Sequence, residues 1–237
     1  MSERFLRQEM LLGGEAMEKL KNSRVAIFGI GGVGSWCAEA LARAGVGAIT
    51  LIDQDCVGES NINRQILALD STLGLEKPEA MARRIRDINP ECSVSTMFAR
   101  YEAADRERFF GEKYDFIVDA IDLVACKVDL IISAKERSIP IISALGTGNK
   151  TDASLLRICD ISKTEGCPLA RVVRKELRKK GINHLSVVFS PEEGIAPEQR
   201  EAPPPGRRSV PGSLVWVPAA AGLLLAQHVV LSLTKSE

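Results

Sequence analysis

A glycine-rich turn between two apolar runs constrains the fold of this 237-residue chain more than any other stretch. The apolar runs cover residues 25–28 and 48–52, and both are short enough for buried strands. Between them, apolar residues recur at helical spacing until Gly45. The glycines of the turn are Gly29, Gly31, Gly32 and Gly34. Strand, glycine turn, helix and strand in this order predict a site where backbone N–H groups at a helix N-terminus bind a phosphate.

The residues after the second strand narrow the choice of nucleotide. The glycine spacing alone fits NAD, FAD and several ATP sites, and Asp53 lies where a ribose-binding carboxylate is expected. The run DQDCVGESNINRQ then supplies Asp55, Asn61, Arg64 and Gln65. A triphosphate site needs such an Arg, because Arg makes bidentate contacts with phosphate. An NAD-dependent dehydrogenase is disfavoured, since it needs no Asn and Arg here and the two histidines, His184 and His228, suggest no catalytic pair.

The remainder of the chain alternates strands with helices, as in a doubly wound sheet. A helical segment is expected over residues 2–22. Further strands are expected at residues 93–98, 114–122, 139–144, 155–158 and 185–189, and helices at 76–87, 101–113, 123–137 and 169–180. The prediction is an α/β fold with a mainly parallel, Rossmann-like sheet and a C-terminal extension. Residues 1–150 form the nucleotide-binding domain. Residues 151–237 pack on the same domain, with a mobile loop at residues 191–212.

Composition excludes several classes of protein. Lys plus Arg and Asp plus Glu both number 31, so binding to nucleic acid requires a local basic patch. The six cysteines form no C-x-x-C pair, which favours reduced thiols in a cytoplasm over disulfides or a four-cysteine zinc site. Residues 214–233 are nearly all apolar and long enough to cross a bilayer. Gln227, His228 and the small residues 219–222 fit a core helix equally well, so we expect a core helix, with membrane association as the alternative.

Three motifs, GIGGVGS, DQDCVGESNINRQ and GLEKPEA, together resemble the adenylating domain of ubiquitin-activating-type enzymes. The resemblance runs from about Arg4 to the C-terminus and implies ATP and Mg²⁺ as ligands. It implies that Arg64 and Lys77 contact the phosphates, that Asp122 holds Mg²⁺ and that Asp53 holds the ribose. The turn glycines, with Asp55, Asn61 and Gln65, complete the implied nucleotide site. Asp119, three residues before Asp122, is either a ligand or a cap on the next helix.

The resemblance also implies a homodimer. Arg4, Phe5, Arg7 and Gln8 match the opening motif of the family. In the family, the Arg that matches Arg7 crosses the dimer interface into the ATP site of the partner. Without the family, Arg7 reads equally well as a solvated charge.

The C-terminal half resembles the tRNA threonylcarbamoyladenosine dehydratase branch of this family. The motifs are GTGNK, LRICDISKT, CPLARVVRKELRKKGI and VVFSPE. Members use ATP to adenylate a threonine carboxylate on an adenosine beside the anticodon, and the group then cyclises with loss of water. The resemblance implies tRNA as partner, bound by a basic helix through Arg171, Arg174, Lys175, Arg178 and Lys179. It also implies a monovalent cation and a cysteine desulfurase with a sulfur acceptor, for which the sequence locates no residues.

Two other functions compete with this one. The first is an adenylyltransferase or sulfur-transfer enzyme that acts on a ubiquitin-like sulfur carrier. The second is a non-catalytic tRNA-binding module, which Arg64, Lys77 and Asp122 disfavour. Cys167 stands where the branch is expected to have an acidic residue, and its thiol is either a bystander or a nucleophile.

Overall fold

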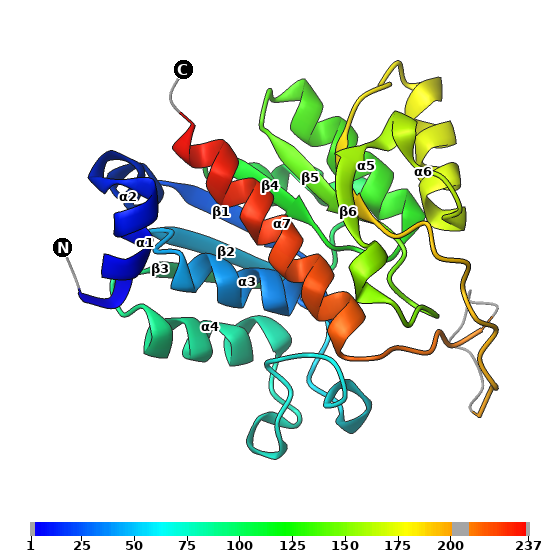
Figure 1. Cartoon of the computed structure of the whole chain (residues 1–237), viewed down its shortest axis with the longest axis horizontal. Coiled ribbons are helices and arrows are strands. Elements are labelled where there is room, and N and C mark those ends of the chain that lie inside the picture. Colours follow the sequence, from blue (N-terminus) through cyan, green and yellow to red (C-terminus); the bar gives the residue numbers. More distant parts are fainter. Residues whose placement is uncertain (1–2, 201–208, 236–237) are drawn as a thin grey trace.

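In the computed structural model, which describes residues 3–200 and 209–235, the strands form a seven-stranded sheet with helices on both faces (Figure 1). The strands are β1 (Arg24–Phe28), β2 (Ala48–Asp53), β3 (Ser93–Phe98), β4 (Phe116–Asp119), β5 (Ile141–Ala144), β6 (Arg157–Asp160) and β7 (Ser186–Phe189). Their order is β3-β2-β1-β4-β5-β7-β6, and every neighbouring pair is parallel except β6 with β7. The predicted doubly wound, mainly parallel sheet is confirmed.

The helices are α1 (Leu6–Leu12), α2 (Gly14–Lys21), α3 (Gly34–Arg43), α4 (Lys77–Ile88), α5 (Val124–Glu136), α6 (Pro168–Lys179) and α7 (Trp216–Thr234). Side chains of β1 alternate between two cores, as a strand buried on both faces requires. Val25 and Ile27 pack in the core with α2, α3, α4 and α7. Ala26 and Phe28 pack in the core with α5 and α6.

The prediction of a charged surface helix over residues 101–113 is wrong. This segment forms 3₁₀ turns over Ala103–Phe110, with non-helical dihedral angles at Asp105. Tyr101 and Phe109 are buried, and the Tyr101 ring packs edge-on against Phe28 at a centroid distance of 5.4 Å.

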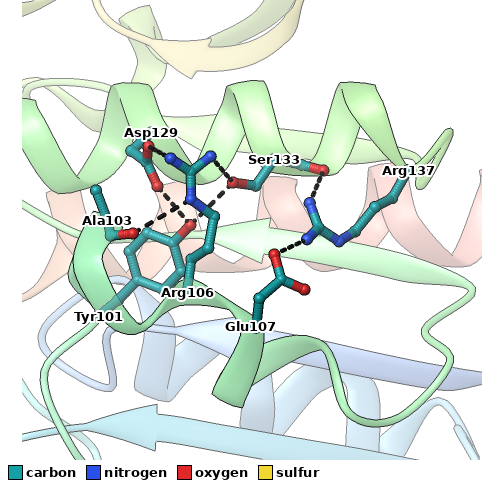
Figure 2. Close-up of polar contacts among 7 residues, drawn as sticks. All are labelled: Tyr101, Ala103, Arg106, Glu107, Asp129, Ser133 and Arg137. Carbon is teal, nitrogen blue, oxygen red and sulfur yellow. Dashed lines mark hydrogen bonds and ion pairs between the residues drawn. The ribbon is translucent and has the colours of Figure 1, made fainter.

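Polar contacts then attach this segment to α5 (Figure 2). Tyr101 Oη lies 2.8 Å from Asp129 Oδ2 and 3.2 Å from Ser133 Oγ. Arg106 pairs with Asp129 at 3.2 Å, and Arg137 pairs with Glu107. Burial raises the pKa of Tyr101, so its hydroxyl remains protonated and able to donate. The charges that suggested a solvated helix therefore belong to an interface with α5.

The apolar C-terminal segment forms α7, which packs on the same face of the sheet as α3 (Figure 1). A Cβ at Gly222 would lie 2.4 Å from Val33 O and 2.8 Å from Trp36 Cβ, so only glycine permits this approach of α7 to α3. Val217, Leu225 and Val229 are fully buried. Among the described residues, α7 alone has the length and apolar composition to cross a membrane, and here it contributes one side to the core.

The loop expected to be mobile, residues 191–212, is anchored where the structure describes it. Asn149 N donates to Gly212 O at 2.8 Å, and Gly212 N donates back to Asn149 Oδ1 at 2.7 Å. Ile195 N donates to Asn149 O at 2.8 Å. Asn149 adopts a left-handed conformation with φ of 62°, which Asn tolerates better than most residues. Residues 201–208 of the expected mobile segment lie outside the described residues.

Candidate active site

The glycine turn joins β1 to α3 at the carboxyl edge of the sheet, where open α/β folds bind ligands. A Cβ on Gly34 would lie 1.8 Å from Gly29 O, so the first turn of α3 closes tightly on the end of β1. Asp53, the last residue of β2, accepts hydrogen bonds from Ile30 N at 2.6 Å and from Asp55 N at 2.8 Å. Burial raises the pKa of Asp53, and Lys77 with these two N–H groups opposes that rise. Asp53 therefore fixes the turn, and its carboxylate oxygens keep lone pairs for a ligand.

Gln65 lies beneath the glycine turn and has an unsatisfied acceptor. A Cβ on Gly31 would have Gln65 Nε2 as its nearest neighbour, at 4.0 Å, so the space above the turn is open. The Gln65 side chain is buried, yet its Oε1 has no hydrogen-bond partner in the part of the chain that the structure describes. Buried acceptors are normally paired, so a ligand donor suits this position.

Two cations flank the turn. Lys77 begins α4, and its buried Nζ lies 2.8 Å from Asp55 Oδ2. The aliphatic part of Arg64 lies against Gly32, where a Cβ would be 3.5 Å from Arg64 Cγ. One guanidinium nitrogen of Arg64 donates to Ser60 O at 2.7 Å, and Trp36 Nε1 donates to Arg64 O at 3.1 Å. Burial lowers the pKa of Arg64, because the charged guanidinium is partly withdrawn from water.

The loop that carries Arg64 is closed by Asn61. Asn61 Oδ1 accepts a hydrogen bond from Gly58 N at 3.1 Å, across the 3₁₀ turn Glu59–Asn61. Asn61 thus shapes the loop that carries Arg64.

Asp122 lies exposed on the loop between β4 and α5. This loop adjoins the glycine turn, because Ala120 N donates to Phe28 O at 2.8 Å. Asp53, Arg64, Lys77 and Asp122 thus lie around one turn, and their roles as ligands stay a prediction. Asp122 is an exposed carboxylate beside the glycine turn, and Mg²⁺ commonly takes one or two carboxylates plus phosphate oxygens, so Asp122 has the chemistry to hold that ion.

Asp119 has neither of the roles that the sequence suggested. Its carboxylate is fully buried and lies 2.7 Å from Lys127 Nζ and 2.6 Å from Ser143 Oγ. Lys127 also donates to Ser143 Oγ at 3.1 Å and to Ala144 O at 2.9 Å. The ion pair ties the carboxyl ends of β4 and β5 to α5. Sequence analysis missed Lys127, whose only signal is one lysine in an otherwise apolar face of α5.

Arg7 does not reach the site of its own chain. Gln8, its neighbour in α1, donates to Ala44 O at the C-terminal end of α3. The glycine turn is at the other end of α3, about 15 Å away for a ten-residue helix. Arg7 is exposed and makes no hydrogen bond or ion pair with any described residue.

The basic residues of α6 line a shallow, open hollow on the other face of the sheet. They are Arg171, Arg174, Lys175, Arg178 and Lys179. The Arg174 guanidinium is engaged in hydrogen bonds within the chain, because one of its nitrogens donates to Thr164 O at 2.8 Å and to Ile161 O at 3.2 Å. Lys179 pairs with Glu176 at 2.8 Å.

The Cys167 thiol is buried and caps the start of α6. Its Sγ accepts a hydrogen bond from Ala170 N at 3.4 Å. This contact gives the thiol a structural role.

Replacing Lys127 by Met tests the buried ion pair. We expect Lys127→Met to lower the free energy of unfolding by about 3–5 kcal/mol, because Asp119 is left as an unpaired buried charge. Urea denaturation measures the change. Arg83→Ala, which removes an exposed pair with Glu79, is the control and should cost less than about 1 kcal/mol. A Lys127→Met loss as small as that of the control would contradict the ion pair.

Comparisons with known proteins agree with this geometry. The ThiF family model matches residues 5–237. The tRNA threonylcarbamoyladenosine dehydratase of Bacillus subtilis (strain 168) is 44% identical over 99% of this chain and 96% of its own length. The crystal structure of the E. coli tRNA N6-threonylcarbamoyladenosine dehydratase in complex with ATP has a TM-score of 0.88 at 36% identity, covering 98% of this chain and 93% of that one. The molybdopterin-synthase adenylyltransferase of Escherichia coli (strain K12) is 36% identical over only 59% of this chain. Because the family model matches nearly the whole sequence, the protein belongs to the ThiF family.

Proposed function

We propose that the protein is a tRNA threonylcarbamoyladenosine dehydratase, which uses ATP to cyclise the threonylcarbamoyl group of a modified adenosine beside the anticodon. The observation that carries this proposal is the extent of the similarity. The Bacillus subtilis dehydratase and the E. coli dehydratase structure match almost the whole chain, whereas the adenylyltransferase of the competing hypothesis matches little more than half of it. A tRNA substrate is consistent with a cytoplasmic enzyme.

The residues around the glycine turn fit ATP. Gly31 leaves space for a phosphate, Arg64 and Lys77 supply positive charge, and the orphan Oε1 of Gln65 suits a donor on the nucleotide. The threonine carboxylate attacks the α-phosphate of ATP, and pyrophosphate leaves. The acyl-adenylate that forms is an electrophile, from which AMP leaves when the carbamoyl group closes the ring. Arg64 and Lys77 stabilise the charge that develops on the phosphates, and Asp122 would hold Mg²⁺, which would neutralise further phosphate charge.

Ring closure then needs no covalent relay through the enzyme. The activated carboxylate and the attacking carbamoyl group belong to one molecule, and such reactions reach effective molarities of about 10⁵ M or more. The buried capping role of Cys167 agrees with a thiol that takes no part.

Mass analysis of the nucleoside tests the function. With ATP and tRNA that bears threonylcarbamoyladenosine, the protein should yield a nucleoside lighter by one water. Arg64→Ala should lower kcat/KM by roughly 30-fold or more, because it removes a partly desolvated contact to phosphate. The control Arg86→Ala, at an exposed position of α4, should leave it unchanged. Normal activity of Arg64→Ala would place the phosphates elsewhere, and loss of product in Cys167→Ser with adenylation intact would establish a thioester step.

We extend the proposal to a homodimer. α1 exposes Leu6, Met10 and Leu11, with 78% of Met10 and 87% of Leu11 accessible, beside Arg7. Exposed apolar groups of this kind favour association. A second copy docked on α1 would bury them and would bring Arg7 to the partner's phosphate site.

Subunit mixing tests the composite site. Arg7→Ala and Arg64→Ala should each have strongly reduced activity alone. An exchanged mixture should recover wild-type activity at about a quarter of its sites, because each mixed dimer contains one intact site. Mixing Arg64→Ala with Arg64→Lys at equal total concentration is the control and should recover nothing. An active enzyme that sediments as a monomer would overturn the dimer.

We further propose that α6 binds the tRNA backbone through Arg171, Lys175 and Arg178. These side chains are exposed, so their charges are available to phosphates. Arg174 instead holds α6 to the preceding loop and positions its neighbours.

The salt dependence of tRNA affinity tests this surface. Changing Arg171, Lys175 and Arg178 to Ala should flatten the plot of log affinity against log salt by about 0.7–0.9 for each phosphate that the helix no longer neutralises. ATP binding should be retained. The control variant changes three exposed cations elsewhere to Ala, namely Arg83 and Arg86 of α4 and Lys113. It should leave the slope unaltered. An unchanged slope in the α6 variant would show that these side chains are merely solvated.

A further inference from the structure

Lys150 is a buried cation to which neither the nucleotide site nor the tRNA surface gives a role. It ends the GTGNK turn that follows β5, and only 5% of its surface is exposed. Its Nζ donates to Ser190 O at 2.5 Å, one residue beyond β7. Across residues 3–200 and 209–235, no carboxylate forms an ion pair with it. The nearby Glu192 is engaged elsewhere, accepting from Thr151 N at 2.8 Å and from Asp152 N at 3.2 Å.

A buried ammonium without a carboxylate is unusual, because lysines are rarely buried unless they are paired. Burial lowers the pKa of Lys150, while the neighbouring Cys167 and Glu192 oppose that change. The ammonium has three N–H donors, and the described residues use one of them. An anion that reaches this group meets a desolvated charge, where attraction is stronger than in water.

The position of Lys150 connects it with the nucleotide site. β4, β5 and β7 are consecutive, parallel strands, so their carboxyl ends share one edge with the loop of Asp122. Neighbouring strands are about 4.8 Å apart, which places the end of β7 about 10 Å from the end of β4. The start of α7 borders both regions. Trp216 Nε1 donates to Thr151 O at 2.7 Å, and Pro218 Cβ lies 3.3 Å from where a Cβ on Gly32 would be.

We propose that Lys150 binds the threonine carboxylate of the modified adenosine and holds it beside the nucleotide. The assignment rests on the proposed dehydratase function. In the proposed function Arg64 and Lys77 serve the phosphates on one side of the Asp122 loop. On the other side, toward β5 and β7, Lys127 has all its donors engaged, whereas Lys150 is a buried cation with donors to spare among the described residues. The cyclised product has no carboxylate, so this contact is made with the substrate and is absent from the product.

A binding cycle without ATP tests the assignment. The dissociation constants of unmodified tRNA and of tRNA bearing threonylcarbamoyladenosine are measured for the wild type, Lys150→Met and Lys150→Arg. We expect the wild type to prefer the modified tRNA. Lys150→Met should lower this preference by roughly 30-fold, and a wild-type preference smaller than that should disappear. The affinity for unmodified tRNA should stay constant. Lys150→Arg keeps the charge and should retain part of the preference.

Lys113→Met is the matched control, because Lys113 is exposed and precedes β4, at the opposite edge of the sheet. Thermal unfolding of each variant shows whether it is folded. A wild-type preference that survives intact in a folded Lys150→Met overturns the assignment and makes Lys150 a structural tie to Ser190. If Lys150→Met does not fold, a measurement on the wild type still tests the assignment. The wild type should bind tRNA that carries the methyl ester of the threonyl group no better than unmodified tRNA. Equal affinity for the ester and the acid overturns the assignment. Failure of the wild type to dehydrate the modified tRNA overturns the proposed function itself.

Discussion

The ion pair between Lys127 and Asp119 holds together the parts of the chain that build the site. All three N–H donors of Lys127 are used, on Asp119, Ser143 and Ala144, so this ammonium has none left for a ligand. Its influence on the site is therefore geometric. It fixes the end of β4, from which the Asp122 loop departs, and that loop in turn supports the glycine turn through Ala120. Lys150 is also buried, but it differs because most of its donors remain unused among the described residues.

Much of the fold was predictable because its signals are local. A strand covered on both faces is a short apolar run, and β1, β2, β4 and β5 all read in this way. The position of the glycine turn and of the polar residues after Asp53 could also be predicted, since the carboxyl ends of parallel strands meet at one edge of the sheet. Their roles as nucleotide ligands came from the family resemblance, while the structure explains how Asp53 and Asn61 also shape their own loops.

The features that the sequence did not reveal depend on distant pairing. The local sequence around a charged side chain does not distinguish a solvated charge from one that is bound to a group far along the chain. Tyr101 meets Asp129, and Arg174 meets Thr164, only after the helices have packed. For this reason residues 101–113 resembled a surface helix, and all of α6 resembled one uniform basic face. Composition could not show the hydrogen bonds of the described part of the 191–212 loop either, where Asn149 bonds to Ile195 and Gly212, and Glu192 accepts from Thr151 and Asp152.

The position of α7 has a consequence for biosynthesis. This helix completes the core formed by β1, α2 and α3, yet it is translated after all seven strands of the described sheet. A ribosome adds about 5–20 residues per second, so the apolar face of α3 that packs against α7 emerges many seconds before α7 does. Until then the surfaces of α3, β5 and β7 that α7 covers are unprotected, and a chaperone that recognises nascent apolar segments has access to them. A stalled ribosome that releases the polypeptide ahead of α7 would yield an aggregation-prone product, although every side chain proposed to bind the nucleotide had already been synthesised.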